Sequence, residues 1–512
     1  MAEADGPEAL SRAPRRRGVL LLHVAGCALL GSLGCSGGGA GGGGGDDVPS
    51  LDAEALQDPE ACASCHPDHF REWSGSMHAY ASDDPVFIAM NARAQRETGG
   101  ALGSFCVDCH APMAVRTGAT QDGLNLDALP RSLRGVTCYF CHSVVDVGEG
   151  HNNGLILADD GILRGSMRNP DPVPTGAHRT EFSSRFEHLS GLSPAMCGSC
   201  HDVVAPPGGA VERTFAEWRG SMFAHDKHAR SCNACHMEPR DGRAATTPGA
   251  PERPVHAHTF AGVDTALTPF PEAEVQREAV QRSLDGTLQG QLCVTGAGSP
   301  GATLQVVLEN VSAGHMWPSG AAHDRRAWVE VIAYAGGQPV YQSGVIAGGE
   351  SVTASLDPDL WLIRECLFDA QGQYVSMLWE AASHESNQLP VPTPSEPSDP
   401  AHGLARVVRT FPRPTSTPAA LAVPPDRVTM RVRLVPVGFD VLDDLIAGGD
   451  LDPLVRGRIP TLDLGGVALE WTAETATHTY DDGGTPVSCV SSGISTPPSE
   501  ASPAPENASC AP

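Results

Sequence analysis

Five short motifs carry the chemistry that this 512-residue sequence could perform. Each places two cysteines three positions apart, with a histidine directly after the second. Two thiols at this spacing reach the two vinyl groups of one porphyrin, and the next imidazole then meets the iron. The motifs therefore predict five covalently bound c-type haems. From the first motif to the fifth, they are Cys62, Cys65 and His66; Cys106, Cys109 and His110; Cys138, Cys141 and His142; Cys197, Cys200 and His201; and Cys232, Cys235 and His236.

Zinc binding and thioredoxin-like redox chemistry are the two other uses of paired cysteines. Neither explains a histidine after every pair, and five pairs suit poorly a zinc site that joins two pairs. Five haems in so short a segment would fill much of its interior. That prediction accords with an aromatic content of only 5%.

Each haem iron needs a second axial ligand unless it binds substrate. His78 is the first candidate because it lies on the helix expected after the first motif. Methionines could also be axial, but histidines are more abundant here. We expect His69 to lie at the surface. His315 could fold back on the haem domain, but packing within a loop is the expectation. The remaining candidates flank the fourth and fifth motifs or precede them: His151, His178, His188, His225, His228, His256 and His258.

One element of the motif region occurs twice. Residues 70–77, Phe-Arg-Glu-Trp-Ser-Gly-Ser-Met, recur as Phe-Ala-Glu-Trp-Arg-Gly-Ser-Met at 215–222. We expect both copies to be helical, with Trp73 and Trp218 as packing walls beside neighbouring haems. Phe223 stands in the second copy where His78 stands in the first. The ligand for the haem that this copy serves must therefore come from His225, His228 or elsewhere.

The N-terminus has the pattern of an export signal. Four arginines between residues 12 and 17 precede an apolar run, 18–33, that is too short to span a bilayer comfortably. Cys35, or alternatively Cys27, follows small residues as in a bacterial lipobox. We therefore expect a signal peptide at 1–34, a lipidated cysteine and a Gly-rich tether at 35–56. The protein would be periplasmic or attached to the outer membrane, with exposure at the cell surface as an option.

The sequence pattern changes after about residue 265. The predicted haem-packed domain, mainly helical or irregular, covers 57–265, and a β-sandwich-like domain covers 266–480, which gives an α+β multidomain protein. A Ser- and Pro-rich tail, extended or disordered, occupies 481–512. Cys489 with Cys510 and Cys293 with Cys366 are the candidate disulfides, although four cysteines allow three pairings. The clearest expected strands are 303–309, 327–334, 374–380, 406–411 and 427–435, with a helix at 441–447.

The formal net charge is −27. This charge repels nucleic acid and favours a partner with a basic surface. An acidic surface also keeps an exported protein soluble, and both interpretations stay open. The haem motifs, rather than the charge, predict other redox proteins as partners, together with a membrane through the lipid anchor.

The motif region resembles the bacterial multihaem cytochrome c family related to the tetrahaem electron carrier of ammonia oxidisers. The resemblance rests on Trp73, Ser76 and His78 after the first motif, on Ala111-Pro112 after the second, and on similar stretches around the later motifs. Residues 314–320 and 324–328 resemble the C-terminal part of such proteins. The resemblance implies electron transfer through mainly bis-histidine haems. It also implies that His78 and one of His178 and His188 are distal ligands.

The leading functional hypothesis is an electron carrier without a catalytic residue. The alternative is a multihaem reductase of a small nitrogen or sulfur oxyanion, which requires one haem with an open sixth site. A third possibility makes the β-rich domain a docking module, with Trp317 and Trp328 as candidate contacts. Whether the protein is an enzyme is left open by the sequence, which favours a carrier.

Overall fold

The structure is a computed structural model that describes residues 51–168, 176–225, 227–394, 396, 398–399, 402–403, 405–482, 484–507 and 510. The predicted signal peptide, Cys27, Cys35 and residues 35–50 of the tether lie outside the described residues. Within the described part of the chain, no helix is long and apolar enough to cross a membrane.

The segment that holds the motifs consists of short helices. Several begin at a proline whose fixed φ suits a first helical turn, and α4 is further capped by Asp84, which accepts from the amides of Val86 and Phe87. The helices are α1 (Pro59–Ala63), α2 (Pro67–Ser74), α3 (Met77–Tyr80), α4 (Pro85–Glu97), α5 (Val107–His110), α6 (Pro112–Arg116), α7 (Cys138–His142), α8 (Ser193–Gly198), α9 (Thr214–Arg219) and α10 (Cys232–His236).

Short strand pairs lie between these helices. β1 pairs with β2, β3 with β4, β5 with β6 and β7 with β8. Their bounds are β1 (Val144–Val147), β2 (Leu155–Leu157), β3 (Ile162–Gly165), β4 (Arg179–Phe182), β5 (Val203–Val204), β6 (Ala210–Glu212), β7 (Pro239–Arg243) and β8 (Glu252–His256). Single 3-10 turns connect elements throughout the described chain: η1 (Ala55–Gln57), η2 (Leu126–Ala128), η3 (Arg131–Leu133), η4 (Ser184–Phe186), η5 (Met222–Ala224), η6 (Val352–Ala354), η7 (Leu378–Glu380), η8 (Gly465–Val467) and η9 (Pro498–Glu500).

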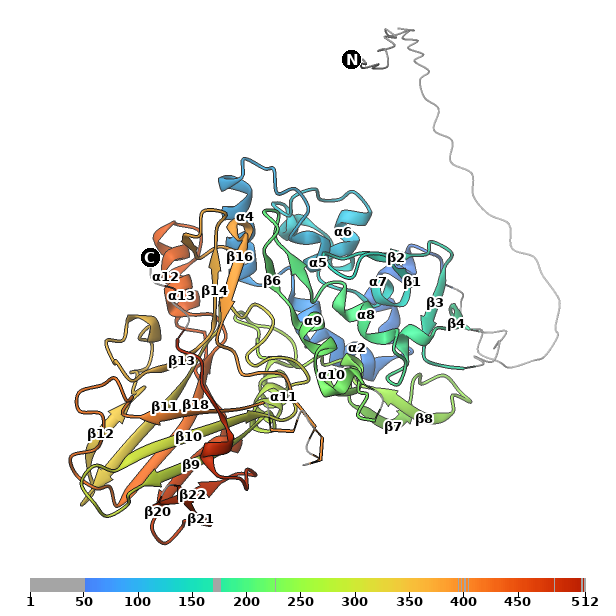
Figure 1. The fold of residues 1–512 in the computed structure, drawn as a ribbon. Helices are drawn as coiled ribbons and strands as arrows, with labels where there is room; N and C mark the ends of the chain where they lie inside the picture. The colour runs from blue at the N-terminus through green and yellow to red at the C-terminus, as the bar shows by residue number, and fades with distance from the viewer. Residues whose placement is uncertain are drawn as a thin grey trace, which may run out of the picture. The chain divides into compact units, whose positions relative to one another are not determined.

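The C-terminal half is rich in strands (Figure 1). One sheet has the order β21-β22-β9-β10-β17-β23; a second has β12-β11-β18-β19, with β13 also on β11 and β20 also on β18; a third has β15-β14-β16. The elements are α11 (Ala273–Asp285), β9 (Leu288–Thr295), β10 (Thr303–Asn310), β11 (Arg326–Ala335), β12 (Gln338–Ser343), β13 (Trp361–Ile363), β14 (Glu365–Phe368), β15 (Tyr374–Val375), β16 (Ser383–Ser386), β17 (Arg406–Phe411), β18 (Arg427–Val435), α12 (Phe439–Ala447), α13 (Pro453–Arg456), β19 (Leu462–Asp463), β20 (Leu469–Thr472), β21 (His478–Asp482), β22 (Thr485–Ser491) and β23 (Ser502–Pro503).

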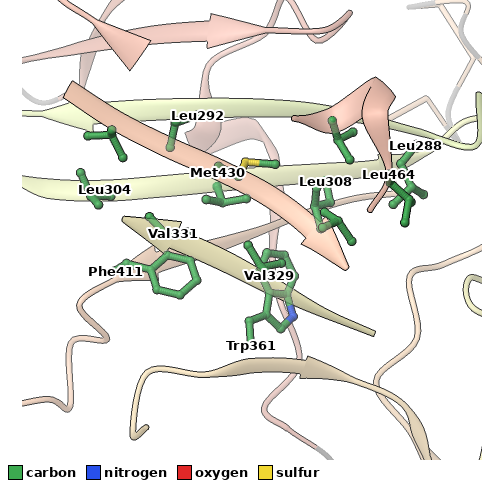
Figure 2. Close-up of a cluster of buried hydrophobic side chains, with 14 of the residues drawn as sticks. Leu288, Leu292, Leu304, Leu308, Val329, Val331, Trp361, Phe411, Met430 and Leu464 are labelled. Atoms are coloured by element: carbon green, nitrogen blue, oxygen red, sulfur yellow. The ribbon is translucent and has the colours of Figure 1, made fainter. Parts of the chain in front are cut away.

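The two larger sheets share one hydrophobic core. Leu292 of β9 and Leu304 of β10 come from the first sheet, while Val331 of β11 and Met430 of β18 come from the second, and all four are fully or almost fully buried. Figure 2 shows these side chains gathered between the strands. At roughly 25 cal/mol per Å² of apolar surface, such burial is a main source of stability for this half of the chain.

The strand pattern of the sequence predicts most of this half. β10, β11, β17 and β18 lie within one residue of the expected strands at each end, and α12 contains the expected helix. The expected strand at 374–380 is wrong, because only β15 forms there and η7 follows it. The tail is not disordered where it forms β22, which hydrogen-bonds to β9. A mixed α+β architecture is confirmed, whereas a haem-packed domain followed by a sandwich stays a prediction.

Two disulfides differ from the pairs expected from the sequence. Cys293 bonds Cys489, and Cys366 bonds Cys510. The reason for the first is the sheet itself, because Cys293 on β9 lies directly opposite Cys489 on β22. The bond joins residues 196 positions apart and is completely buried.

Replacing both Cys293 and Cys489 by alanine is expected to lower the free energy of unfolding by about 2–5 kcal/mol, because the cross-link restricts the unfolded chain. Chemical denaturation of the double variant measures this loss. Peptide mapping of the unreduced wild-type protein tests the pairing independently. A Cys489–Cys510 peptide would contradict the structure.

A buried acid lies where β14 meets the hairpin that follows the fourth motif. Glu365 is 5% exposed, and its Oε1 has no hydrogen-bond partner among the described residues. Burial, followed by the charges of Glu217 and Glu212, raises its pKa to about 8. The folded protein therefore holds a proton on Glu365 in a pH range where the unfolded chain has released it.

Glu365→Gln is expected to flatten the pH dependence of stability. The folded pKa lies above the unfolded one, so the wild-type contribution is present below about pH 4.5 and is lost as pH rises to about 8. The variant should gain roughly 2–4 kcal/mol relative to wild type between pH 5 and pH 8. Thermal unfolding at both pH values measures the gain, with the exposed Glu474→Gln as control. If Glu365→Gln and Glu474→Gln change the stability equally at both pH values, Glu365 does not have a raised pKa.

Candidate haem-binding site

The five motifs lie on, or at the ends of, helices of only four to six residues: α1, α5, α7, α8 and α10. Helices this short are not stable alone, so other parts of the chain must hold them. Four motif histidines are held through Nδ1, which faces a backbone carbonyl: His66 that of Ala244, His110 that of Ala81, His142 that of Arg164 and His236 that of Ala261.

A carbonyl oxygen can only accept, so Nδ1 carries the proton in these four rings and Nε2 is left with a lone pair. Among the described residues, no hydrogen bond engages Nε2 of any motif histidine. This is the arrangement that metal-binding imidazoles adopt, with the outer nitrogen fixed by a carbonyl and the inner one free for the metal. The residues therefore fit a haem iron, whose axial coordination they would supply.

All ten motif cysteines are free thiols, so both disulfides leave them available for thioether bonds. Within the described residues, no group of three or more cysteine, histidine or acidic side chains has a geometry that could hold a metal ion by itself. The described cysteines are thus not arranged as a zinc tetrahedron.

The motifs approach one another through their cysteines. The thiols are close enough to shift one another's pKa in the pairs Cys62 and Cys138, Cys109 and Cys200, and Cys197 and Cys232. Cys141 is also close enough to Cys197 to feel its charge. The motifs therefore follow the spatial order first, third, fourth, fifth, with the second beside the fourth. Sequence order does not reveal this arrangement.

Three motif histidines lie near a second histidine that was expected as a ligand, and His66 also lies 6.2 Å from the ring of His69, at 90°. The ring centres are 6.0 Å apart for His66 and His178, and 6.2 Å for His201 and His78. For His142 and His258 the separation is 6.4 Å. Two imidazoles on opposite sides of one metal have ring centres about 6 Å apart, since each metal–nitrogen bond is about 2 Å. All three separations suit a shared iron.

The other expected ligands lie in different surroundings. His256 directs Nδ1 to the carbonyl of Met237, and its ring lies 5.2 Å from that of His188. His151 is partly buried, and its Nδ1 has no partner among the described residues. His225 and His228 are exposed.

His69 is not the surface residue expected from its position. It is partly buried, and its ring meets that of His258 at 4.8 Å. Burial, followed by the charges of neighbouring groups, lowers its pKa to about 4.

The two copies of the repeated element make equivalent tryptophan hydrogen bonds to two different motifs. Trp73 Nε1 donates to the carbonyl of Val136 at 2.8 Å, and Trp218 Nε1 donates to that of Arg230 at 2.9 Å. Each acceptor stands two residues before a motif, the third and the fifth. The tryptophans are therefore hydrogen-bonding anchors of the third and fifth motifs rather than packing walls alone.

His78 and Phe223 also occupy equivalent backbone positions in the two copies of the repeat. The carbonyl of His78 accepts from the amide of Val136, and the carbonyl of Phe223 accepts from the amide of Arg230. The second copy thus has the same backbone contacts but no imidazole at the corresponding position.

A loop from the β-rich half, residues 314–319, packs against the second copy of the repeat. A Cβ on Gly314 would lie 3.8 Å from the Phe223 ring and 4.0 Å from that of Trp218. Glu217 holds the loop further on, accepting from the amide of Met316 and from the hydroxyl of Ser319. His315 is thereby placed beside the residue that replaces His78.

His315 has the orientation seen in the motif histidines. Its Nδ1 donates to the carbonyl of Met316 at 2.8 Å, which leaves Nε2 with a lone pair. Burial, together with the nearby charges of His236 and His201, lowers its pKa to about 4. His315 packs within its loop, as expected, and the loop itself lies against the second copy of the repeat. Of the two alternatives that the sequence left open, a position against the motif region is thus compatible with loop packing.

His201 differs from the other motif histidines. Its Nδ1 lies 3.3 Å from the Glu212 carboxylate instead of a carbonyl. Half of its side chain is exposed (51%). Desolvation by the surrounding protein lowers the pKa of His201, but the Glu212 carboxylate outweighs this effect, and the resulting pKa is about 9. Burial instead leaves the pKa of His110, His142 and His236 lowered. Glu212 was not among the predicted site residues, because a single acid in a hairpin carries no motif.

Comparison with known proteins agrees with this geometry. The family model described as cytochrome c554 and c-prime matches residues 61–143, which contain the first three motifs. No curated protein matches the chain. The crystal structure of a penta-heme cytochrome c552 from Thermochromatium tepidum superposes with a TM-score of 0.56 at 19% sequence identity, covering 81% of this chain and 99% of that one.

The similarity to the penta-heme protein is one of fold. The family match reaches only part of the chain, and the relation to the carrier of ammonia oxidisers stays a resemblance. The matched motifs and the histidine geometry support covalent haem binding in the region of the first three motifs.

Proposed function

We propose that this chain is an electron-transfer protein that holds five covalently bound haems, most of them between two histidines, and exchanges electrons with other redox proteins. Haem supplies a one-electron couple whose potential depends on its axial ligands and their surroundings. The protein contributes the thiols, the axial imidazoles and the order of the five sites.

The observation that carries this proposal is the set of three histidine pairs at 6.0–6.4 Å. Two imidazoles on one iron leave no position for a substrate, so these three sites suit electron transfer rather than catalysis. The adjacency of the motif cysteines supports a continuous route. Its order would run from the first motif through the third and fourth to the fifth, with the second as a branch.

The first motif provides a direct test of axial ligation. His178→Ala is expected to convert one haem from low spin to high spin, because His178 faces His66. His188→Ala, which changes the other histidine of this region, is the matched control and should leave that haem low spin. Electron paramagnetic resonance of the oxidised proteins measures both. If only His188→Ala converts a haem to high spin, then His188 rather than His178 is the axial ligand.

For the fifth motif, we propose His315 as the second axial ligand. The support is its free Nε2, the proximity of His236 and its position beside Phe223. This proposal replaces His225 and His228, which are exposed, as the candidates for that site.

His315→Ala is expected to produce one high-spin haem and leave the other haems unchanged. His225→Ala is the control, and its spectrum should match that of the wild type. If His225→Ala gives the high-spin signal and His315→Ala does not, the earlier candidate is correct. Pyridine haemochrome analysis of both variants verifies that haem content is unchanged.

A reductase acting at the second motif is the other candidate function. Among the described residues, no second histidine ring faces His110, which instead stacks on Phe87 with ring centres 3.9 Å apart. An open sixth position there would suit a small nitrogen or sulfur oxyanion. Carbon monoxide binding by the reduced protein together with turnover of nitrite would favour the reductase. Absence of turnover favours the carrier.

The location of the protein is part of the proposal. The N-terminal pattern supports export and a lipid anchor at Cys35 or Cys27, which would place the haems on the outer side of the cytoplasmic membrane or at the outer membrane. Mass spectrometry of the mature N-terminus distinguishes a lipidated cysteine from a simple signal cleavage.

A further inference from the structure

The fourth motif is the only one of the five whose histidine meets a carboxylate in the described structure. The other four donate Nδ1–H to neutral backbone carbonyls. His201 has the Glu212 carboxylate at 3.3 Å in the corresponding position. An anionic acceptor draws the proton of the outer nitrogen toward itself and makes the inner nitrogen a stronger donor to a metal.

The fold holds Glu212 in this position from several sides. It stands at the end of β6, opposite Val203 of β5, so the hairpin that follows the motif returns the acid to it. The amide of Phe215 then donates to the carbonyl of His201, which fixes the other end of the same residue. The amide of Gly209 donates to the carbonyl of Ala381 and attaches the hairpin to the β-rich half.

No neighbouring cation among the described residues competes with His201 for a hydrogen bond to the Glu212 carboxylate. Arg325 is near enough to interact with the carboxylate electrostatically, but its guanidinium binds both oxygens of Asp264 at 2.9 Å. His323 is a weaker electrostatic neighbour. Among the described residues, His201 is the hydrogen-bonding partner of the Glu212 side chain.

We propose that Glu212 is a positioning residue that makes the haem of the fourth motif more difficult to reduce, by increasing the electron donation of His201 to its iron. This inference rests on the proposed function, because it requires a haem at the fourth motif. The oxidised iron carries one positive charge more than the reduced iron, so a stronger anionic donor stabilises the oxidised state. The effect is local, although the Glu212 charge also reaches His110.

The position of the fourth motif gives this effect a role in electron transfer. Its cysteines lie beside those of the second, third and fifth motifs, so the fourth is the junction of the proposed route. A low potential at the junction favours the departure of an electron toward whichever neighbour is oxidised. Glu212 would thereby regulate how electrons distribute among the branches.

Glu212→Gln separates charge from position, because the amide oxygen can still accept from Nδ1–H while the negative charge is lost. We expect one of five reduction steps to move to higher potential by at least tenfold in its equilibrium constant, about 59 mV for one electron. Spectroelectrochemical titration of the purified holoprotein measures the five steps. Glu365→Gln, at a buried acid of the same region without contact to a motif histidine, controls for the acid-to-amide change alone, because Glu365 is protonated at neutral pH. Glu474→Gln controls for the loss of an exposed charge, and neither variant should move a step.

Two further measurements keep the outcomes distinct. Pyridine haemochrome analysis must give five haems per chain, because a wild-type protein with no haem at the fourth motif would refute the proposed function itself. Five haems with unchanged midpoints in Glu212→Gln overturn the inference alone.

If this variant fails to mature, Glu212→Asp, which keeps the charge, is compared with wild type by paramagnetic resonance. In the wild type, one low-spin signal should have a narrower spread of g values than the others. In Glu212→Asp the shorter side chain moves the carboxylate away from His201, so the g spread of this signal should widen. Equal spectra overturn the inference.

Discussion

Every motif depends on contacts from outside its own helix. A helical turn of four to six residues gains too few hydrogen bonds to offset the entropy of ordering it, so its direction must be set by tertiary contacts. The carbonyls that meet the motif histidines and the tryptophans that anchor the third and fifth motifs provide these contacts. The segments between the motifs therefore act as scaffold, which explains why so much of this region consists of short strands and turns.

Local chemistry was predictable from the sequence, and long-range partners were not. The spacing of Cys62, Cys65 and His66 identifies a haem motif because the requirement is met within five residues. β17 and β18 were likewise evident, since alternating burial is a local pattern. The partner of Cys489 is different, because it depends on β22 lying beside β9, and no feature near Cys489 records that pairing.

The candidate ligands divide in the same way. His78, His178 and His258 were proposed from their positions near motifs, and each now faces a motif histidine. For His315, packing within a loop was preferred over folding back on the haem domain. Its role depends on the equivalence of Phe223 and His78, which the sequence repeat suggested, and on the loop that covers Phe223, which only the fold reveals. A missing residue in one copy of a repeat is thus a reason to look for a replacement elsewhere.

The contact between residues 314–319 and the second copy of the repeat also bears on the order of assembly. During synthesis, the fifth motif emerges well before the loop that covers its neighbouring helix. The anchors of the first four motif histidines all lie before residue 245, whereas the surroundings of the fifth are completed by a loop between β10 and β11. A nascent chain therefore reaches its final state at the fifth motif only after the β-rich half has begun to fold.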